Sequence, residues 1–130
     1  MKIINGKDAI MGRLASYVAK EALKGEDIVI LNCDQIIITG SREFIKEDFE
    51  ERRKRIGSGQ MGPKISRSSD KIVKRAIRGM LPDHRKGRGK IAFSKIKCYV
   101  GIPKEFQDSK KISGGKEVTS KFIRVGDIKK

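Results

Sequence analysis

The continuous apolar run at residues 28–31, Ile-Val-Ile-Leu, constrains the fold more than any other feature of this 130-residue chain. It shows no alternation of polar and apolar side chains, which is typical of a central strand that is covered on both faces. Residues 2–5 form another short apolar strand candidate, and between the two, residues 13–23 carry apolar side chains at intervals of three and four, which predicts a helix. A strand, a helix and a strand begin a βαβ crossover, so the sequence predicts an α/β domain with a small, mostly parallel sheet.

A second β-branched run, residues 36–39, follows the first after a break at residues 32–35. That gap is too short for a crossover between parallel strands, so we expect the two runs to form an antiparallel hairpin. A last sheet strand is expected at residues 97–100, after a short helical turn at 91–96, and a weak strand-like patch lies at residues 122–125.

A chain of this length fits one domain with a real core. We expect an α/β domain at residues 1–105, which includes a basic insertion at 52–90. Residues 106–130 are expected to be a C-terminal extension, an appendage whose order depends on contacts outside the domain.

Two charged helices are expected in the middle of the chain. The first begins after Ser41 and continues to about residue 55; it has few large apolar residues, so it is either largely solvated or covered by a partner at its basic end. The second is capped by Ser68 or Ser69 and continues to about residue 78. On a helical wheel it has an apolar side and a cationic side. The apolar side consists of Ile72, Val73, Ala76, Ile77 and Met80, and the cationic side consists of Lys71, Lys74, Arg75 and Arg78.

Positive charge is concentrated in residues 52–90, which hold fourteen Lys and Arg side chains and only two acids, Asp70 and Asp83. The net charge is −2 for residues 1–50, +13 for residues 51–100 and +4 for residues 101–130. A near-neutral part followed by a strongly cationic one is typical of a folded base that presents a face to a polyanion. Eight of the fourteen are Arg, whose planar guanidinium binds phosphate bidentately. We therefore expect this insertion to bind nucleic acid.

The same insertion contains no Phe, Tyr or Trp. Modules that bind single strands stack bases on aromatic rings, so a cationic surface without rings indicates recognition of backbone and shape. Folded RNA is the indicated ligand, ahead of duplex DNA. The predicted binding residues in the insertion are Arg52, Arg53, Arg55, Lys64, Arg67, Lys71, Lys74, Arg75, Arg78, Arg85, Lys86, Arg88 and Lys90. They lie on the helix at 69–78 and around two glycine-rich loops, at 57–63 and 83–90.

The glycines of the first loop, Gly57, Gly59 and Gly62, fit the spacing of a dinucleotide-binding motif. The context does not fit, because the motif follows a charged helix and Pro63 stands where a helix should open. A flexible loop that lets the backbone approach nucleic acid closely is the better interpretation.

Catalytic and metal chemistry find no support in the sequence. His84 is the only histidine, and P-loop spacing and clustered zinc ligands are absent, so we expect no enzymatic activity, cofactor, metal or small-molecule substrate. Cys33 and Cys98 lie in apolar runs and are expected to be buried free thiols. No apolar run is long enough to cross a membrane, and a cytoplasmic location is expected.

Five short stretches resemble the universal large-subunit ribosomal protein thirteen family in its archaeal and eukaryotic form. They are GRLAS at 12–16, NCDQIIITG at 32–40, RAIRGMLP at 75–82, RG at 88–89 and KCYVGIP at 97–103. The resemblance covers roughly residues 1–105, and RAIRGMLP is its most specific part. It implies a three-layer α/β/α domain with basic loop and helix extensions embedded in large-subunit ribosomal RNA. It also implies neighbouring large-subunit ribosomal proteins as partners, and a structural role without catalysis.

By position, the resemblance assigns eight residues to an RNA-facing motif: Arg75, Arg78, Gly79, Met80, Leu81, Pro82, Arg88 and Gly89. Gly12 and Arg13 match the start of the family's first helix, where a helix N-terminus could meet phosphate, so Arg13 joins the predicted RNA-binding residues. Many relatives have histidine where this chain has Asp83, and no role is transferred to His84. The leading hypothesis is a structural constituent of the large ribosomal subunit that binds folded ribosomal RNA. The alternative is a free DNA- or RNA-binding regulator that uses the helix near residues 69–80, and a nucleotide-dependent enzyme is the third possibility.

Overall fold

The main sheet of the computed structural model contains β4 (Ile96–Cys98), β2 (Ile28–Leu31), β1 (Lys2–Asn5) and β5 (Ile112–Ser113), in that spatial order. Every neighbouring pair in this sheet is parallel. The structure describes residues 1–55, 66–108, 111–113 and 120–128. The predicted α/β class with a mostly parallel sheet is confirmed.

The central strand β2 is buried along its whole length. Ile28 and Ile30 belong to the main core cluster, and Val29 and Leu31, whose side chains alternate with them to the other face, are 2% and 0% exposed. The absence of polar positions in this strand therefore reflects cover on both faces, as the sequence predicts.

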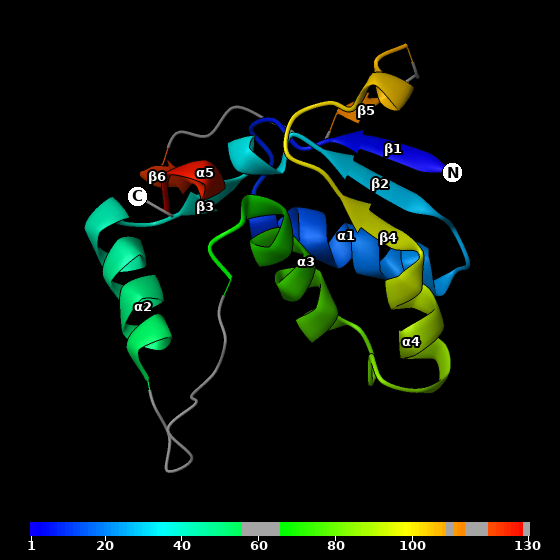
Figure 1. The fold of residues 1–130 in the computed structure, drawn as a ribbon, viewed down its shortest axis with the longest axis horizontal. Coiled ribbons are helices and arrows are strands. Elements are labelled where there is room, and N and C mark those ends of the chain that lie inside the picture. The colour runs from blue at the N-terminus through cyan, green and yellow to red at the C-terminus, as the bar shows by residue number, and fades with distance from the viewer. Residues whose placement is uncertain (56–65, 109–110, 114–119, 129–130) are drawn as a thin grey trace.

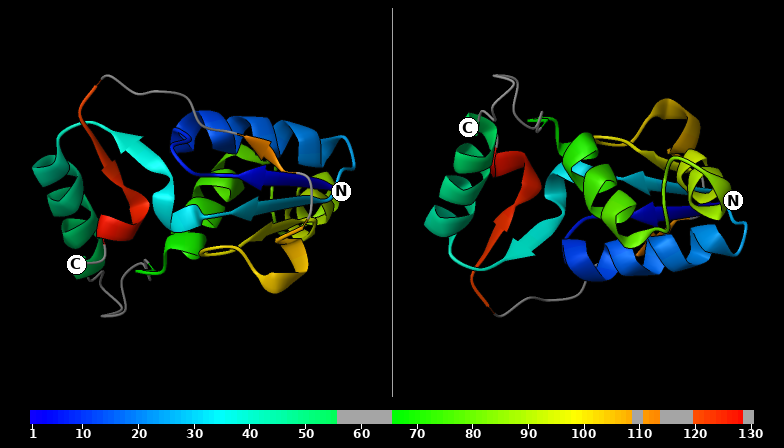
Figure 2. Two further views of the ribbon diagram at one scale, coloured as in Figure 1. Left: turned by 90° about the horizontal axis from the view of Figure 1, so that it is seen from above. Right: turned by 90° about the horizontal axis from the view of Figure 1, so that it is seen from below.

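Three helices lie on one face of the main sheet, below it in Figure 1: α1 (Met11–Leu23), α3 (Ser69–Met80) and α4 (Gly87–Ser94). The short helix η2 (Lys104–Phe106) lies on the opposite side (Figures 1 and 2). Val18 of α1, Ile77 of α3 and Ala92 of α4 meet in the core beneath the strands. The position of α3 is thus fixed by its apolar side.

The expected hairpin is wrong. Strand β3 (Ile37–Thr39) pairs antiparallel with β6 (Phe122–Arg124), not with β2. Both edges of β2 are already hydrogen-bonded, to β1 and to β4, so no edge remains for β3. The chain turns away from the main sheet at Asn32, whose φ is 56°, and passes through the short helix η1 (Cys33–Gln35).

A second hydrophobic cluster joins α2 (Arg42–Lys54), β6 and α5 (Val125–Ile128), which lie together at one side of the molecule in Figure 1. It consists of Ile45, Ile123 and Ile128, and Ile45 is the only residue of α2 that is buried. The strand-like patch near residue 122 is confirmed as β6. Val125 belongs to the main core, so this part of the C-terminal extension packs on the domain.

Three boundaries differ from the sequence prediction. Helix α3 continues through Gly79 to Met80, and α4 begins at Gly87, so Arg88 and Lys90 lie in a helix and not in a basic loop. The helical turn expected at 91–96 is the second half of α4, and the strand that follows begins one residue earlier than expected, at Ile96. Within the described ranges, no helix is long and apolar enough to cross a membrane.

Candidate nucleic-acid interface

Helix α3 has the two sides that its sequence predicts, with one exception. Ile72, Val73 and Ile77 are 6%, 1% and 1% exposed. Met80, predicted for the same apolar side, is instead 47% exposed. It lies in the last helical turn, past the core, where it lines a shallow surface hollow with Tyr17 of α1.

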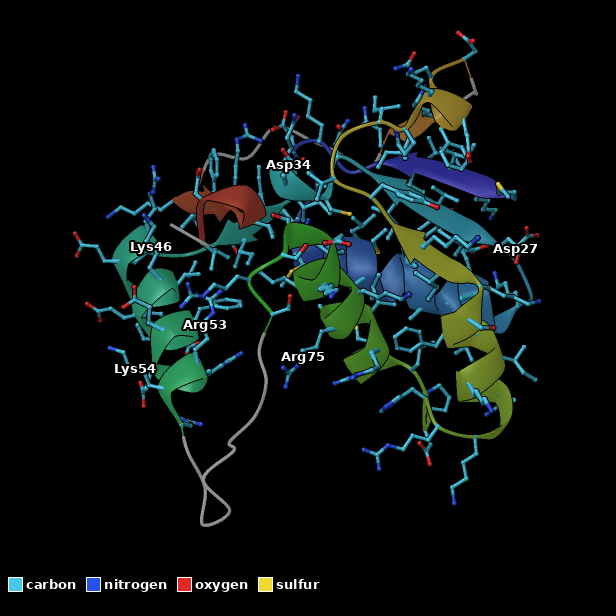
Figure 3. The ribbon with its side chains drawn as sticks, viewed as in Figure 1. Asp27, Asp34, Lys46, Arg53, Lys54 and Arg75 are labelled. Carbon is cyan, nitrogen blue, oxygen red and sulfur yellow. The ribbon has the colours of Figure 1, made fainter. Side chains whose placement is uncertain are left out.

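The cationic side of α3 lines a groove of about 460 Å³ between α3 and α2. Lys71 and Arg75 are exposed, whereas Lys74 and Arg78 are half-buried. Figure 3 shows Arg75 on α3 and Arg53 on the side of α2 that faces α3. Among the described residues, neither Lys71 nor Arg78 forms an ion pair. The groove therefore presents uncompensated positive charge to solvent.

Two aromatic rings line this groove, although residues 52–90 contain none. Phe49 comes from α2 and Phe93 from α4. Each ring lies near a cation of this chain, since Lys74 Nζ is 5.0 Å from the centroid of Phe93 and Arg52 Cζ is 5.7 Å from that of Phe49. Such contacts are attractive and hold the cations in place. The spacing of three residues between Phe49 and Arg52 was the available sequence signal; the contribution of Phe93 depends on the tertiary fold.

The arginines at the end of α2 have different surroundings. Arg52 Nη2 lies 2.9 Å from Asp48 Oδ2, and Arg55 Nη2 lies 3.4 Å from Glu51 Oε1. For Arg53, burial lowers the pKa of the guanidinium below its ordinary value, and the positive charge of Arg67 lowers it further.

A second basic surface begins after α3. Arg85 and Lys86 are exposed in the turn that precedes α4, and Arg88 and Lys90 are exposed in its first turn, which contains no acidic residue. The helix N-terminus carries a partial positive charge of its own. Positive potential from the side chains and from the backbone therefore adds at this end of α4.

Gly89 allows this arrangement. It is buried, and a Cβ atom there would lie 2.3 Å from the carbonyl oxygens of both Pro82 and Asp83. Only a residue without a side chain fits, so the first turn of α4 packs directly on the backbone that follows α3.

The structure thus brings some predicted residues together and separates others. Those that line the α2–α3 groove are Arg52, Lys71, Lys74, Arg75 and Arg78. The α4 group is separate, and Arg13 is exposed at the start of α1 without lining the groove. Lys64 and the glycines at 57, 59 and 62 lie outside the described residues.

The part of the chain that the structure describes contains no candidate metal site and two free cysteines. No group of three or more His, Cys, Asp or Glu side chains could hold a metal ion there. Cys33 and Cys98 are free thiols; Cys33 is buried and Cys98 is half-buried.

Comparison with known proteins identifies the family. Residues 1–105 match the family model described as ribosomal protein L13. Proteins named large ribosomal subunit protein uL13 from Methanococcoides burtonii and Methanocaldococcus jannaschii are each 41% identical to the chain, over 98% and 100% of its length and over 94% and 96% of theirs. A protein of the same name from Methanococcus maripaludis is 43% identical over 98% of this chain and 94% of its own. This chain, with its cationic α2–α3 groove, therefore belongs to the ribosomal protein L13 family.

Proposed function

We propose that this protein is a structural constituent of the large ribosomal subunit that binds folded ribosomal RNA through the α2–α3 groove and the basic surface at the start of α4. The names of its archaeal relatives support the assignment to the large subunit. The positive charge of Lys71 and Arg78, which form no ion pair among the described residues, is the observation that carries the RNA-binding role.

The fixed orientation of α3 supports binding to RNA of defined shape. Its apolar side is anchored by Val73 and Ile77, each 1% exposed, so its cations are held in constant positions relative to the sheet. Guanidinium and ammonium groups at fixed positions fit phosphates that are also at fixed positions, as in a folded RNA. The two rings of the groove are engaged by cations of this chain, which favours backbone contact over base stacking.

The alternative role, a free regulator that reads a short site with α3, has less support. A recognition helix must project to enter a major groove about 12 Å wide. The cationic side of α3 instead lines a recess whose other wall includes Phe49 and Arg52 of α2. Such a concave protein surface fits the convex phosphate backbone of a nucleic acid better than it fits the base edges on the floor of a major groove.

Sedimentation tests the proposed function in cell extract. The protein should travel with the large subunit and leave it only at high salt. If six to ten phosphates are contacted, affinity for ribosomal RNA should fall by about 10³ to 10⁵ between 50 and 200 mM salt. Recovery mainly in the soluble fraction at low salt would refute the assignment.

The double variant Arg75→Ala/Arg78→Ala tests the cationic side of α3. It should reduce the slope of log affinity against log salt by about 1 for each cation that contacts a phosphate. The thermal midpoint of the free protein should change little, because these side chains lie opposite the apolar side. Filter binding to protein-free large-subunit RNA and a melting curve give the two values.

Lys7→Ala/Lys104→Ala is the matched control. It removes the same charge from two exposed positions that do not line the groove, and its effect on the slope should be smaller. Ile77→Asp, in contrast to the α3 double variant, should lower the thermal midpoint, because it places a charge on the apolar side and unfolds α3 from the core. An α3 double variant that enters subunits as efficiently as the control would contradict the assigned faces.

A further inference from the structure

Near the end of α2, Arg53 differs from Arg52 and Arg55 in the side chain that lies four residues before it. Arg52 and Arg55 each have a carboxylate four residues earlier. At the same spacing, Arg53 has Phe49, whose ring centroid lies 5.9 Å from the guanidinium carbon. The order of residues in α2 therefore leaves the charge of Arg53 without the carboxylate that compensates its neighbours.

The unused donors of Arg53 form a single edge of the guanidinium group. Its Nε and Nη2 atoms are shielded from solvent and have no hydrogen-bond acceptor among the residues that the structure describes. Nε–H and Nη2–H point in the same direction, along the edge that binds the two oxygens of a carboxylate or phosphate. Buried donors without acceptors destabilise the free protein, and an anion with two oxygens would satisfy both.

A second guanidinium acts on Arg53 from the segment before α3. The positive charge of Arg67 opposes that of Arg53, whose pKa is lowered first by burial and then by this repulsion, while Glu50 acts in the other direction. Arg67 is exposed, and its neighbour Ser66 lines the α2–α3 groove. Arg67 is thus close enough to Arg53 to repel its charge, and it follows directly after a residue that lines the groove.

We propose that Arg53 and Arg67 together hold one backbone phosphate of the bound RNA beside the α2–α3 groove. This inference rests on the proposed function and names a particular anion site within it. A phosphodiester would accept the two donors of Arg53, and its negative charge would remove the repulsion from Arg67. Arg53 is only partly buried, so rotation about its last side-chain bonds can turn the donor edge to the groove without movement of α2.

The first experiment compares Arg53→Met with the matched control Lys54→Met, in the full chain with protein-free large-subunit RNA. Lys54 is the next residue of α2 and is exposed. Methionine keeps much of the apolar stem and removes the charge and the donors. Arg53→Met should weaken binding about tenfold or more and reduce the salt slope by about 1, whereas Lys54→Met should change both less. The double variant Arg53→Met/Arg67→Met should lose less RNA affinity than the product of the fold losses of the two single variants, because the two residues share one phosphate.

The second experiment measures thermal unfolding of the free protein in inorganic phosphate and in chloride at equal ionic strength. Phosphate should raise the midpoint of the natural protein and not that of Arg53→Met. In chloride, Arg53→Met should unfold at the same temperature as the natural protein or above it, because the uncompensated buried donors are gone. A merely structural arginine would give the opposite result in chloride.

The possible failures are distinguishable. If the natural protein binds the RNA and Arg53→Met binds it as Lys54→Met does, the phosphate site is refuted and the proposed function stands. If the natural protein does not bind the RNA, the proposed function fails and this site fails with it. If Arg53→Met binds RNA normally but no longer enters subunits when other ribosomal proteins are present, the occupant is an acidic side chain of a neighbour, and the phosphate site is refuted.

Discussion

The contact of Gly89 with the backbone of Pro82 and Asp83 is a single-residue requirement with a measurable cost. A Cβ atom 2.3 Å from two carbonyl oxygens cannot be relieved by a side-chain rotation, because the atoms it meets are backbone. Gly89→Ala should therefore displace the turn before α4 and destabilise the protein by about 1–3 kcal/mol. Urea unfolding measures the loss, and RNA binding should weaken because Arg85 and Arg88 move with the turn.

Gly79→Ala is the control for that substitution. Gly79 is helical, and an added Cβ there would meet nothing within 4 Å. Alanine should stabilise the free protein by about 0.5–1 kcal/mol, because it loses less conformational entropy in a helix than glycine does. Equal stabilities for the two variants would show that the close contact at Gly89 is not a constraint.

Cys33 predicts how stability depends on pH in the alkaline range. Its hydrogen bond with the thiol of Cys98 and its burial raise the pKa of Cys33 well above the ordinary value. The thiol stays protonated in the folded protein but ionises in the unfolded chain above about pH 8.5. Stability should therefore fall as the pH rises above that value, by up to about 1.4 kcal/mol per pH unit from this group.

Denaturant unfolding at pH 7, 8, 9 and 9.5 under reducing conditions measures this dependence. Cys33→Ala serves as the reference, because it lacks the ionisable group and should show a flatter decline whatever its absolute stability. Parallel curves for the two proteins would mean that Cys33 does not carry the pH dependence.

At the scale of elements, α2 is attached to the rest of the molecule by few apolar contacts. Its only buried residue, Ile45, packs with Ile123 of β6 and Ile128 of α5. Ile123→Ala should cost about 2–5 kcal/mol if the cavity does not collapse. It should also loosen α2, so the α2 wall of the groove would be affected from a distant position.

Hydrogen exchange tests this coupling. Amides of α2 should lose protection in Ile123→Ala, whereas Ile112→Ala on β5, where the side chain is 44% exposed, should leave them unchanged. Unaltered protection of α2 in Ile123→Ala would mean that α2 is held by other contacts.

Local patterns were sufficient for some elements and insufficient for others. The buried strand β2 follows from four consecutive apolar residues, and the two sides of α3 follow from side-chain periodicity, because both signals lie in residues that are neighbours in the sequence. The partner of β3 could not be predicted in the same way, since β6 is far away in the chain and the edges of β2 were taken by β1 and β4. At the site, the cations of α3 were predictable. The position of Phe93 in the groove and the Arg53 donors that lack an acceptor were not, because they depend on tertiary packing.

At the scale of the whole molecule, the net charge of +15 is arranged unevenly, with +13 on residues 51–100. Close cations repel one another in the free protein, and salt screens this repulsion over about 10 Å at 0.1 M. Raising the sodium chloride concentration should therefore raise the thermal midpoint of the free protein while it weakens RNA binding. Thermal melts between 0.05 and 0.5 M sodium chloride test this, and a falling midpoint would show that attractive pairs such as Arg52–Asp48 dominate.

The antiparallel pair of β3 and β6 also has a consequence for the order of events during synthesis. Arg124 Nη1 donates to the carbonyl oxygen of Gln35, 89 residues earlier in the chain. One edge of β3 pairs with β6 in this late segment, whereas Ile37 forms an isolated bridge with Ile10 on its other side. Until translation reaches β6, an edge that carries Ile37 and Ile38 stays unpaired, and such edges invite association with other chains. For most of the time that its synthesis takes, a nascent chain of this protein would therefore lack the strand that covers this edge.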